Sequence, residues 1–299
     1  MKNKPAKAEK TSRSKTGPVE AAGEAVIAVG GKMSKKAKEP ETPRRRIVLL
    51  DDIRGFAVLC MVFYHAFFLW AEVFDLSSGV TLLETFEPLE PFFAGVFIVI
   101  SGISCRLSRN NALRGVKLLG VALALTGITA LLLPRLGFKG TEIYFGILHL
   151  LSISMLVFSL LRPLLNKIRQ EWGMLICLIL YALTVGIGEG FVGIKGILSF
   201  PLPQSLYELS WLFPLGIPNA AFRSADYFPL IPNLFLFLAG TYLGIYVKLG
   251  RTPKWAYKGR VVALGWLGRN ALLVYITHVP VIFALTYITL FIVNKFIPV

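Results

Sequence analysis

Long apolar runs separated by short polar stretches dominate the chain after about residue 46. A helix that spans a bilayer needs about 20 predominantly apolar residues. Seven runs have suitable length, and they lie near 48–70, 89–108, 115–134, 143–161, 173–190, 228–248 and 270–293. The pattern therefore predicts an all-α fold, a polytopic transmembrane helical bundle of about seven spans.

The segment 191–227 is also apolar, but glycine and proline interrupt it repeatedly. Its prolines are Pro201, Pro203, Pro214, Pro218. Broken backbone is tolerated at membrane depth only where protein or a water-filled cavity covers it. We therefore expect a re-entrant or broken helical segment at 191–227, beside a cavity.

The composition agrees with lipid as the main solvent of the chain. Of the 299 residues, 55% are hydrophobic and 16% are charged, whereas soluble domains have about 45–50% apolar and about 25% charged residues. These proportions exclude a soluble enzyme. The net charge of +15 would favour a nucleic-acid partner in a soluble protein, but in a membrane protein basic residues set the orientation, so no nucleic acid is expected.

The basic residues are distributed unevenly along the chain. Residues 1–46 hold 13 Lys and Arg with 5 Glu, and their one apolar patch, at 25–29, is too short to be buried. This composition predicts a disordered basic cytoplasmic tail before a transmembrane domain at 47–299. Around the predicted spans, 26 basic residues lie on the side of this tail and 5 on the other side. This positive-inside pattern predicts a multi-pass protein of the cytoplasmic membrane with its N-terminus inside and its C-terminus outside.

The first predicted span carries ionisable residues on one face. Arg54 and His65 are eleven residues apart, and at about 100° per residue they share a face, about 16 Å apart along the helix axis. Asp51 lies three residues before Arg54, so it can pair with it. Charges at mid-bilayer cost about 2.5–3.5 kcal/mol each, which favours a functional role. The alternative is that Asp51 and Arg54 are interfacial anchors and that His65 belongs to an outer aromatic belt.

These residues lie in motifs that resemble a known family. Leu-Asp-x-x-Arg-Gly-x-Ala at 50–57, followed by Met-Val-x-Tyr-His at 61–65, resembles the opening of heparan-alpha-glucosaminide N-acetyltransferase-like membrane proteins. The spacing of Arg and His is similar to that of the wider transmembrane acyltransferase superfamily, and stretches 100–110, 226–232 and 268–278 match its bacterial branch. The resemblance covers about 45–295. It implies transfer of an acyl group, usually acetyl, from cytoplasmic acyl-CoA to a sugar on the far side.

The resemblance and the chemistry of the residues together indicate a site. The expected catalytic residues are His65, Asp226 and Arg54. His65 would either deprotonate an acceptor hydroxyl or amine, or carry the acyl group itself. The residues expected to bind acyl-CoA (acetyl-CoA) are Arg54, Ser101, Arg106 and Arg109, and those expected in a buried polar network are Asp51, Asn270 and His278.

Several of these residues also have a plain structural interpretation. Ser101 belongs to a small polar stripe that is typical of helix packing. Arg106 and Arg109 resemble ordinary positive-inside anchors. Asp226 suits a helix N-cap, and His149, in the fourth predicted span, fits a packing role as well as a catalytic one.

No metal site is expected, because Cys60, Cys105 and Cys177 lie in apolar runs without metal-ligand spacing. The predicted partners are acyl-CoA, an extracytoplasmic glycan or glycolipid acceptor, and membrane lipids, while the sequence leaves the oligomeric state open. The alternative function is a non-enzymatic transporter or a lipid- or sugar-binding protein whose polar stripe lines a permeation path. The absence of an internal repeat in the sequence disfavours that alternative.

Overall fold

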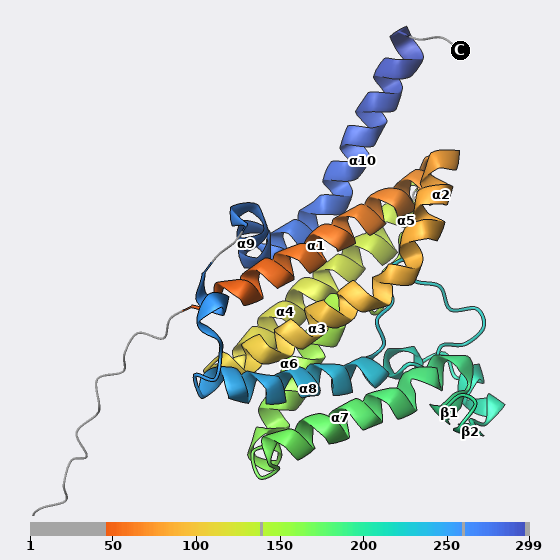
Figure 1. Ribbon diagram of the computed structural model, residues 1–299. Helices are drawn as coiled ribbons and strands as arrows, with labels where there is room; N and C mark the ends of the chain where they lie inside the picture. The colour runs from red at the N-terminus through yellow and green to blue at the C-terminus, as the bar shows by residue number, and fades with distance from the viewer. Residues whose placement is uncertain (1–45, 138–139, 259–260, 297–299) are drawn as a thin grey trace, which may run out of the picture. The chain divides into compact units, whose positions relative to one another are not determined.

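The computed structural model describes residues 46–137, 140–258 and 261–296. Apart from Arg46, the predicted tail at 1–46 lies outside these residues. The α-helices are α1 Val48–Phe68, α2 Ser77–Phe86, α3 Glu90–Leu107, α4 Asn111–Thr126, α5 Leu133–Arg135, α6 Ile147–Leu165, α7 Gln170–Thr184, α8 Leu230–Lys248, α9 Val262–Arg269 and α10 Ala271–Phe296 (Figure 1). Two π-helical segments, η1 Leu69–Val73 and η3 Gly127–Leu132, continue α1 and α4.

Seven helical stretches of the described residues are long and apolar enough to cross a membrane. They are Val48–Val73, Ser77–Leu107, Asn111–Arg135, Ile147–Leu165, Gln170–Glu189, Leu230–Lys248 and Ala271–Lys295. This result confirms the predicted all-α, multi-pass membrane fold. The second stretch is longer than predicted, because α2 leads through the 3-10 turn η2 (Glu87–Leu89) directly into α3. Pro88 and Pro91 lie in the first turns of η2 and α3, where a missing N–H removes no hydrogen bond.

The segment 191–227 differs from the predicted re-entrant or broken helix. It begins with an antiparallel hairpin of β1 (Phe191–Ile194) and β2 (Leu198–Pro201), and two 3-10 turns follow, η5 Gln204–Glu208 and η6 Phe213–Leu215. Gly193 and Gly196 have φ values of 119° and 86°, which favour glycine and end a helix. Because Phe, Val and Ile next to these glycines suit a strand, a hairpin replaces the helix there.

Helix α6 lies at the centre of the described core. Leu150 and Phe158 of α6 are fully buried, as is Phe237 of α8. Helix α8 lies against α3 and α7 and also contacts α6. Gly102 of α3 faces the backbone of α8 so closely that a side chain would overlap the carbonyl oxygen of Phe237. Small residues of this kind let membrane helices approach each other.

Helix α1 carries three of the candidate residues, Asp51, Arg54 and His65. It contacts α3, α9 and α10. A Cβ at Gly55 of α1 would overlap the carbonyl oxygen of Leu264, and one at Gly268 of α9 would overlap that of Asp51. The N-terminal half of α1 is therefore held against α9, while its other half, which carries His65, meets α10.

Candidate active site

Two histidines from different helices meet inside the bundle. His65 of α1 and His278 of α10 have ring centroids 4.9 Å apart and planes at 77°. Each Nδ1 lies near a carbonyl oxygen of its own helix, at 2.9 Å from Met61 and 3.0 Å from Val274. Since a carbonyl oxygen can only accept, each Nδ1 donates, and the Nε2 atom of a neutral ring keeps its lone pair. The pair thus holds two nitrogens that can each accept a proton.

The Nε2 atom of His278 is buried without a hydrogen-bond partner among the described residues. Buried polar atoms in native proteins nearly always have a partner in the protein or in ordered water. Such an atom beside the histidine pair therefore indicates a place for water or a polar ligand group. It supports an interpretation of the histidine pair as part of a binding site rather than of the packed core.

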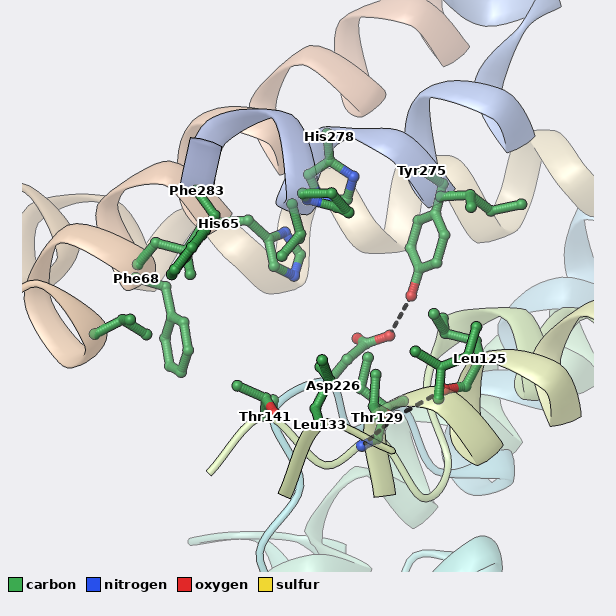
Figure 2. Close-up of a pocket in the computed structure, with 18 residues that line it drawn as sticks. His65, Phe68, Leu125, Thr129, Leu133, Thr141, Asp226, Tyr275, His278 and Phe283 are labelled. Atoms are coloured by element: carbon green, nitrogen blue, oxygen red, sulfur yellow. Dashed lines mark hydrogen bonds between the residues drawn. The ribbon is translucent and has the colours of Figure 1, made fainter. Parts of the chain in front are cut away.

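The histidine pair borders a cavity of about 390 Å³ (Figure 2). Its polar lining residues are His65, Thr129, Thr141, Asp226, Tyr275 and His278. The rest of the lining is apolar and comes from α1, η1, α4, η3, α5, α10 and the 141–143 and 225–226 segments. A mostly apolar cavity with a few convergent polar groups is the usual form of a small-molecule site.

Asp226 does not cap the helix that follows it. Its Oδ2 atom accepts from the backbone N–H of Ile147 at 3.2 Å, at the first turn of α6, and from the hydroxyl of Tyr275 on α10. Backbone hydrogen bonds from Ala225 to Glu142 and from Phe228 to Phe145 hold the 225–228 segment beside α6. The carboxylate thus meets the N-terminal donors of another helix, where negative charge is favourable.

The environment of Asp226 changes its proton affinity. Burial raises the pKa of its carboxyl, and the hydrogen bonds from Tyr275 and Ile147 oppose this shift in part. Figure 2 shows the carboxylate pointing to Tyr275 within the cavity that also holds His65 and His278. The predicted residues Asp226, His65 and His278 therefore lie together around one cavity.

Arg54 lies in a separate polar cluster nearer the start of α1. Its Nη1 is 3.4 Å from Asp51 Oδ1, as the sequence predicts, and its Nη2 donates to the hydroxyl of Ser104 on α3. Arg46 donates to the second oxygen of Asp51 at 2.7 Å. The Arg54 side chain is 18% exposed, so it is fixed in place yet remains accessible from one side.

Arg106 and Ser101 have partners within the protein. The Arg106 guanidinium donates to the Thr241 carbonyl and to Asn166, at 3.1 and 2.6 Å, and it lies over the Phe158 ring. Its Nη2 atom is buried without a hydrogen-bond partner among the described residues. Ser101 donates to the carbonyl of Phe97 in its own helix. Both residues are buried. These contacts favour structural roles for Arg106 and Ser101 over the predicted roles in binding a phosphate-bearing ligand.

The remaining predicted residues lie apart from these clusters. Arg109 is exposed in the turn after α3. Asn270 lies between α9 and α10, where its amide donates to the carbonyl of Trp266. His149 accepts from the Gly146 N–H through Nδ1, and its Nε2 lies 3.3 Å from the Thr126 hydroxyl. Because both ring nitrogens of His149 have partners, its contacts favour the packing role.

Two side chains outside the predicted set also belong to the site. Tyr275 holds Asp226, and Ser104 holds Arg54. Tyr275 lies three residues before His278, so the two share a helix face, and this spacing was a usable signal. Ser104 lies in the same polar stripe as Ser101. Which of the two serines contacts Arg54 depends on the rotation of α3 relative to α1.

Chemically, the arrangement combines two functions along α1. One end offers a fixed arginine that can bind an anion through two N–H groups. The other end offers paired imidazoles with free Nε2 atoms beside a cavity, which suits proton transfer to or from a bound group. The described residues include no group of three or more His, Cys, Asp or Glu that could hold a metal ion.

Comparison with known proteins gives one family match. The model of the family described as heparan-alpha-glucosaminide N-acetyltransferase, catalytic, matches residues 46–280. No curated protein and no solved structure matches the chain significantly.

Proposed function

Because the chain belongs to the heparan-alpha-glucosaminide N-acetyltransferase catalytic family, we propose that it transfers acetyl from cytoplasmic acetyl-CoA to an amine or hydroxyl of an extracytoplasmic sugar. The observation that carries this proposal is the histidine pair at the cavity, with His65 and His278 at 4.9 Å between centroids. The distribution of basic residues supports a cytoplasmic donor, because it predicts that the Arg54 end of α1 faces the cytoplasm.

The Arg54 end of α1 suits a donor that carries phosphates. Arginine binds phosphate oxygens through two parallel N–H groups, and Asp51 and Ser104 hold Arg54 in one orientation. The charges of Arg46 and Arg114 also act on Arg54. We assign the phosphates of the donor to Arg54 and to the exposed Arg109, while the contacts of Arg106 favour its structural role.

The distance along α1 then matches the shape of the donor. Arg54 and His65 lie about 16 Å apart along the axis. A phosphate group bound near Arg54 leaves the extended pantetheine arm to reach along the helix toward the histidine pair. In this proposal the thioester carbonyl lies beside His65 at the edge of the cavity.

The proposed transfer replaces the thioester bond of the donor with an amide or ester bond to the acceptor. The acceptor amine or hydroxyl attacks the thioester carbonyl carbon, a C–N or C–O bond forms, and the C–S bond breaks. An Nε2 atom of the histidine pair takes the proton of the acceptor and returns it to the departing sulfur, which leaves as the free thiol. In the covalent alternative, Nε2 of His65 attacks the thioester carbonyl carbon, the C–S bond breaks and CoA leaves as the thiolate. The acceptor then attacks the acetyl-histidine, the bond to Nε2 breaks, and Nε2 of His278 takes the proton of the acceptor. Asp226, held by Tyr275, would orient the acceptor within the same cavity.

The proposal is tested with protein in nanodiscs, acetyl-labelled acetyl-CoA and an alkyl glucosaminide, which offers both an amine and hydroxyls. We expect label to reach the acceptor, and His65→Ala to lower the rate by about 10²–10⁴-fold, the usual contribution of a general base. Phe63→Leu is the control, because Phe63 is an exposed residue of the same helix. Label that stays on wild-type protein but not on His65→Ala would favour the covalent route, and failure to consume acetyl-CoA would favour the transport or binding alternative.

A further inference from the structure

The cavity beside the histidine pair is larger than an acetyl group requires. Its volume is about 390 Å³, enough for roughly a dozen groups the size of a water molecule at about 30 Å³ each. The residues of α1 and η1 that line it are His65 and residues beyond it, such as Phe68 and Val73. The cavity therefore extends from His65 away from the Arg54 end, where we place the phosphates of the donor.

The walls of this space are poorly suited to a bare sugar. They consist largely of side chains without polar atoms, among them Leu125, Leu133, Val279 and Phe283. A sugar buried among them would lose water from several hydroxyls without gaining partners, and each such loss opposes binding. An alkyl chain has no such penalty and gains from leaving water. The polar groups that could hold a sugar lie at the histidine pair and around Asp226.

Two lining residues on opposite walls are themselves exposed. Ile128 of η3 is 48% exposed and Ile276 of α10 is 39% exposed. Both belong to stretches that are long and apolar enough to cross a membrane, where apolar surface outside the bundle meets the hydrocarbon of the bilayer. The cavity thus borders the lipid between η3 and α10, and Figure 1 shows the end of α10 extending past the other helices.

Two of the helical segments that border the cavity are π-helical. Both π-helical segments, η1 and η3, contribute lining residues, including Leu69 and Ile128. Single π-helical turns inside helices are uncommon and frequently occur at functional sites. Their shared position on one cavity is a second sign, independent of the side chains, that this space accommodates a ligand.

We propose that the acceptor is a glycolipid whose alkyl or polyprenyl chain occupies this cavity. The sugar lies at the histidine pair, where its amine or hydroxyl meets Nε2, and the chain leaves between η3 and α10 into the bilayer. This inference rests on the proposed acetyl transfer, since a two-carbon acyl group leaves the apolar volume to the acceptor.

The first test compares acceptors that differ only in chain length. The protein is placed in nanodiscs, because alkyl glycoside detergents would compete, and is given labelled acetyl-CoA with methyl, octyl or dodecyl β-glucosaminide. We expect kcat/KM to rise by at least roughly tenfold from methyl to dodecyl. Val279→Phe narrows the cavity and should remove most of this gain. Val281→Phe is the matched control, since Val281 is exposed on the same helix. The two variants gain the same side chain, and the acceptor partitions into the bilayer equally with both.

Equal kcat/KM for all three acceptors would overturn the inference while leaving acetyl transfer intact. So would an equal loss of the rise in kcat/KM with chain length in the Val279→Phe and Val281→Phe proteins. Dodecanoyl-CoA is the competing occupant. If Val279→Phe lowers the use of dodecanoyl-CoA and not that of dodecyl glucosaminide, the cavity holds the acyl chain of the donor and the inference is wrong.

A second test does not depend on activity. A dodecyl glucosaminide with a photoactivatable diazirine in its chain is crosslinked to the protein, and the labelled peptides are identified by mass spectrometry. We expect label on 125–133 and 276–283, and less of it in Val279→Phe than in Val281→Phe. Label spread over the outer helix faces, and equal in the two variants, would overturn the inference. Crosslinking within the cavity without any acetyl transfer would instead reject the proposed function alone.

Discussion

The hydrogen bond between Tyr275 and Asp226 gives a prediction whose size depends on pH. Tyr275→Phe removes the hydroxyl that donates to Asp226 Oδ2 and keeps the ring. Both residues are buried, so water does not readily replace the lost donor. A hydrogen bond to a charged group contributes about 1.5–3 kcal/mol and one between neutral groups about 0.5–1.5 kcal/mol. The loss is therefore larger when Asp226 is ionised.

The sign of the pH dependence follows from the raised pKa of Asp226. An aspartate has a pKa of about 3.9 in an unfolded chain. Because the folded-state pKa is higher, the stability that Asp226 contributes is full below about pH 4 and is lost as the pH rises through the folded pKa. Tyr275 opposes the shift, so its removal raises the folded pKa further and increases the loss at higher pH.

We therefore expect Tyr275→Phe to lower the free energy of unfolding by about 0.5–1.5 kcal/mol at pH 4, and by about 1.5–3 kcal/mol once the pH exceeds the raised pKa of Asp226. The assay is equilibrium unfolding in mixed micelles with increasing dodecyl sulfate, followed by the fluorescence of the five tryptophans. Tyr287→Phe, at an exposed position of α10, should cost little at either pH. If the loss of free energy of unfolding in Tyr275→Phe stays constant or decreases from pH 4 to pH 8, this reasoning is refuted. The same pH dependence of that loss in an Asp226→Asn background would also refute it.

Three further substitutions separate binding from structure. Arg54→Lys keeps the charge but loses the planar fork, so the Kd for acetyl-CoA should rise by roughly tenfold in isothermal titration; an unchanged Kd would exclude Arg54 from the donor site. Arg106→Met should lower the free energy of unfolding by about 1–3 kcal/mol, through the lost contacts with Asn166 and Thr241. The KM for acetyl-CoA should not change, and a selective rise in KM would return Arg106 to the donor site. Gly268→Ala should cost about 1–3 kcal/mol, because its Cβ would overlap the Asp51 carbonyl, and wild-type stability in the same unfolding assay would contradict the close contact of α1 with α9.

The periodicity of the sequence is sufficient to predict the membrane-spanning helices and the relative positions of the ionisable residues along α1. Seven apolar runs became seven helices able to cross a membrane, and the pairing of Asp51 with Arg54 followed from their spacing of three. These features depend on local sequence and on helix geometry, which are both readable without a fold.

Contacts between segments that are distant in the sequence could not be predicted in this way. Nothing in the sequence fixes which α10 residue faces His65, because that depends on how α10 crosses α1. Asp226 was expected as a possible cap of its own helix, whereas it meets the first turn of α6. The hairpin at 191–201 was missed because apolar strands and broken apolar helices share a composition, and short runs do not separate the two.

In the proposed acetyl transfer from acetyl-CoA, His65 and His278 together move a proton. The most direct measurement is the release of free CoA thiol by protein in nanodiscs with acetyl-CoA and dodecyl glucosaminide, for wild type, His65→Asn, His278→Asn and Phe63→Leu. We expect acceptor-dependent thiol release by wild type and Phe63→Leu, and a decrease of about 10²–10⁴-fold in His65→Asn and His278→Asn. Release that is unchanged in His65→Asn, or absent from wild type, would contradict this proposal.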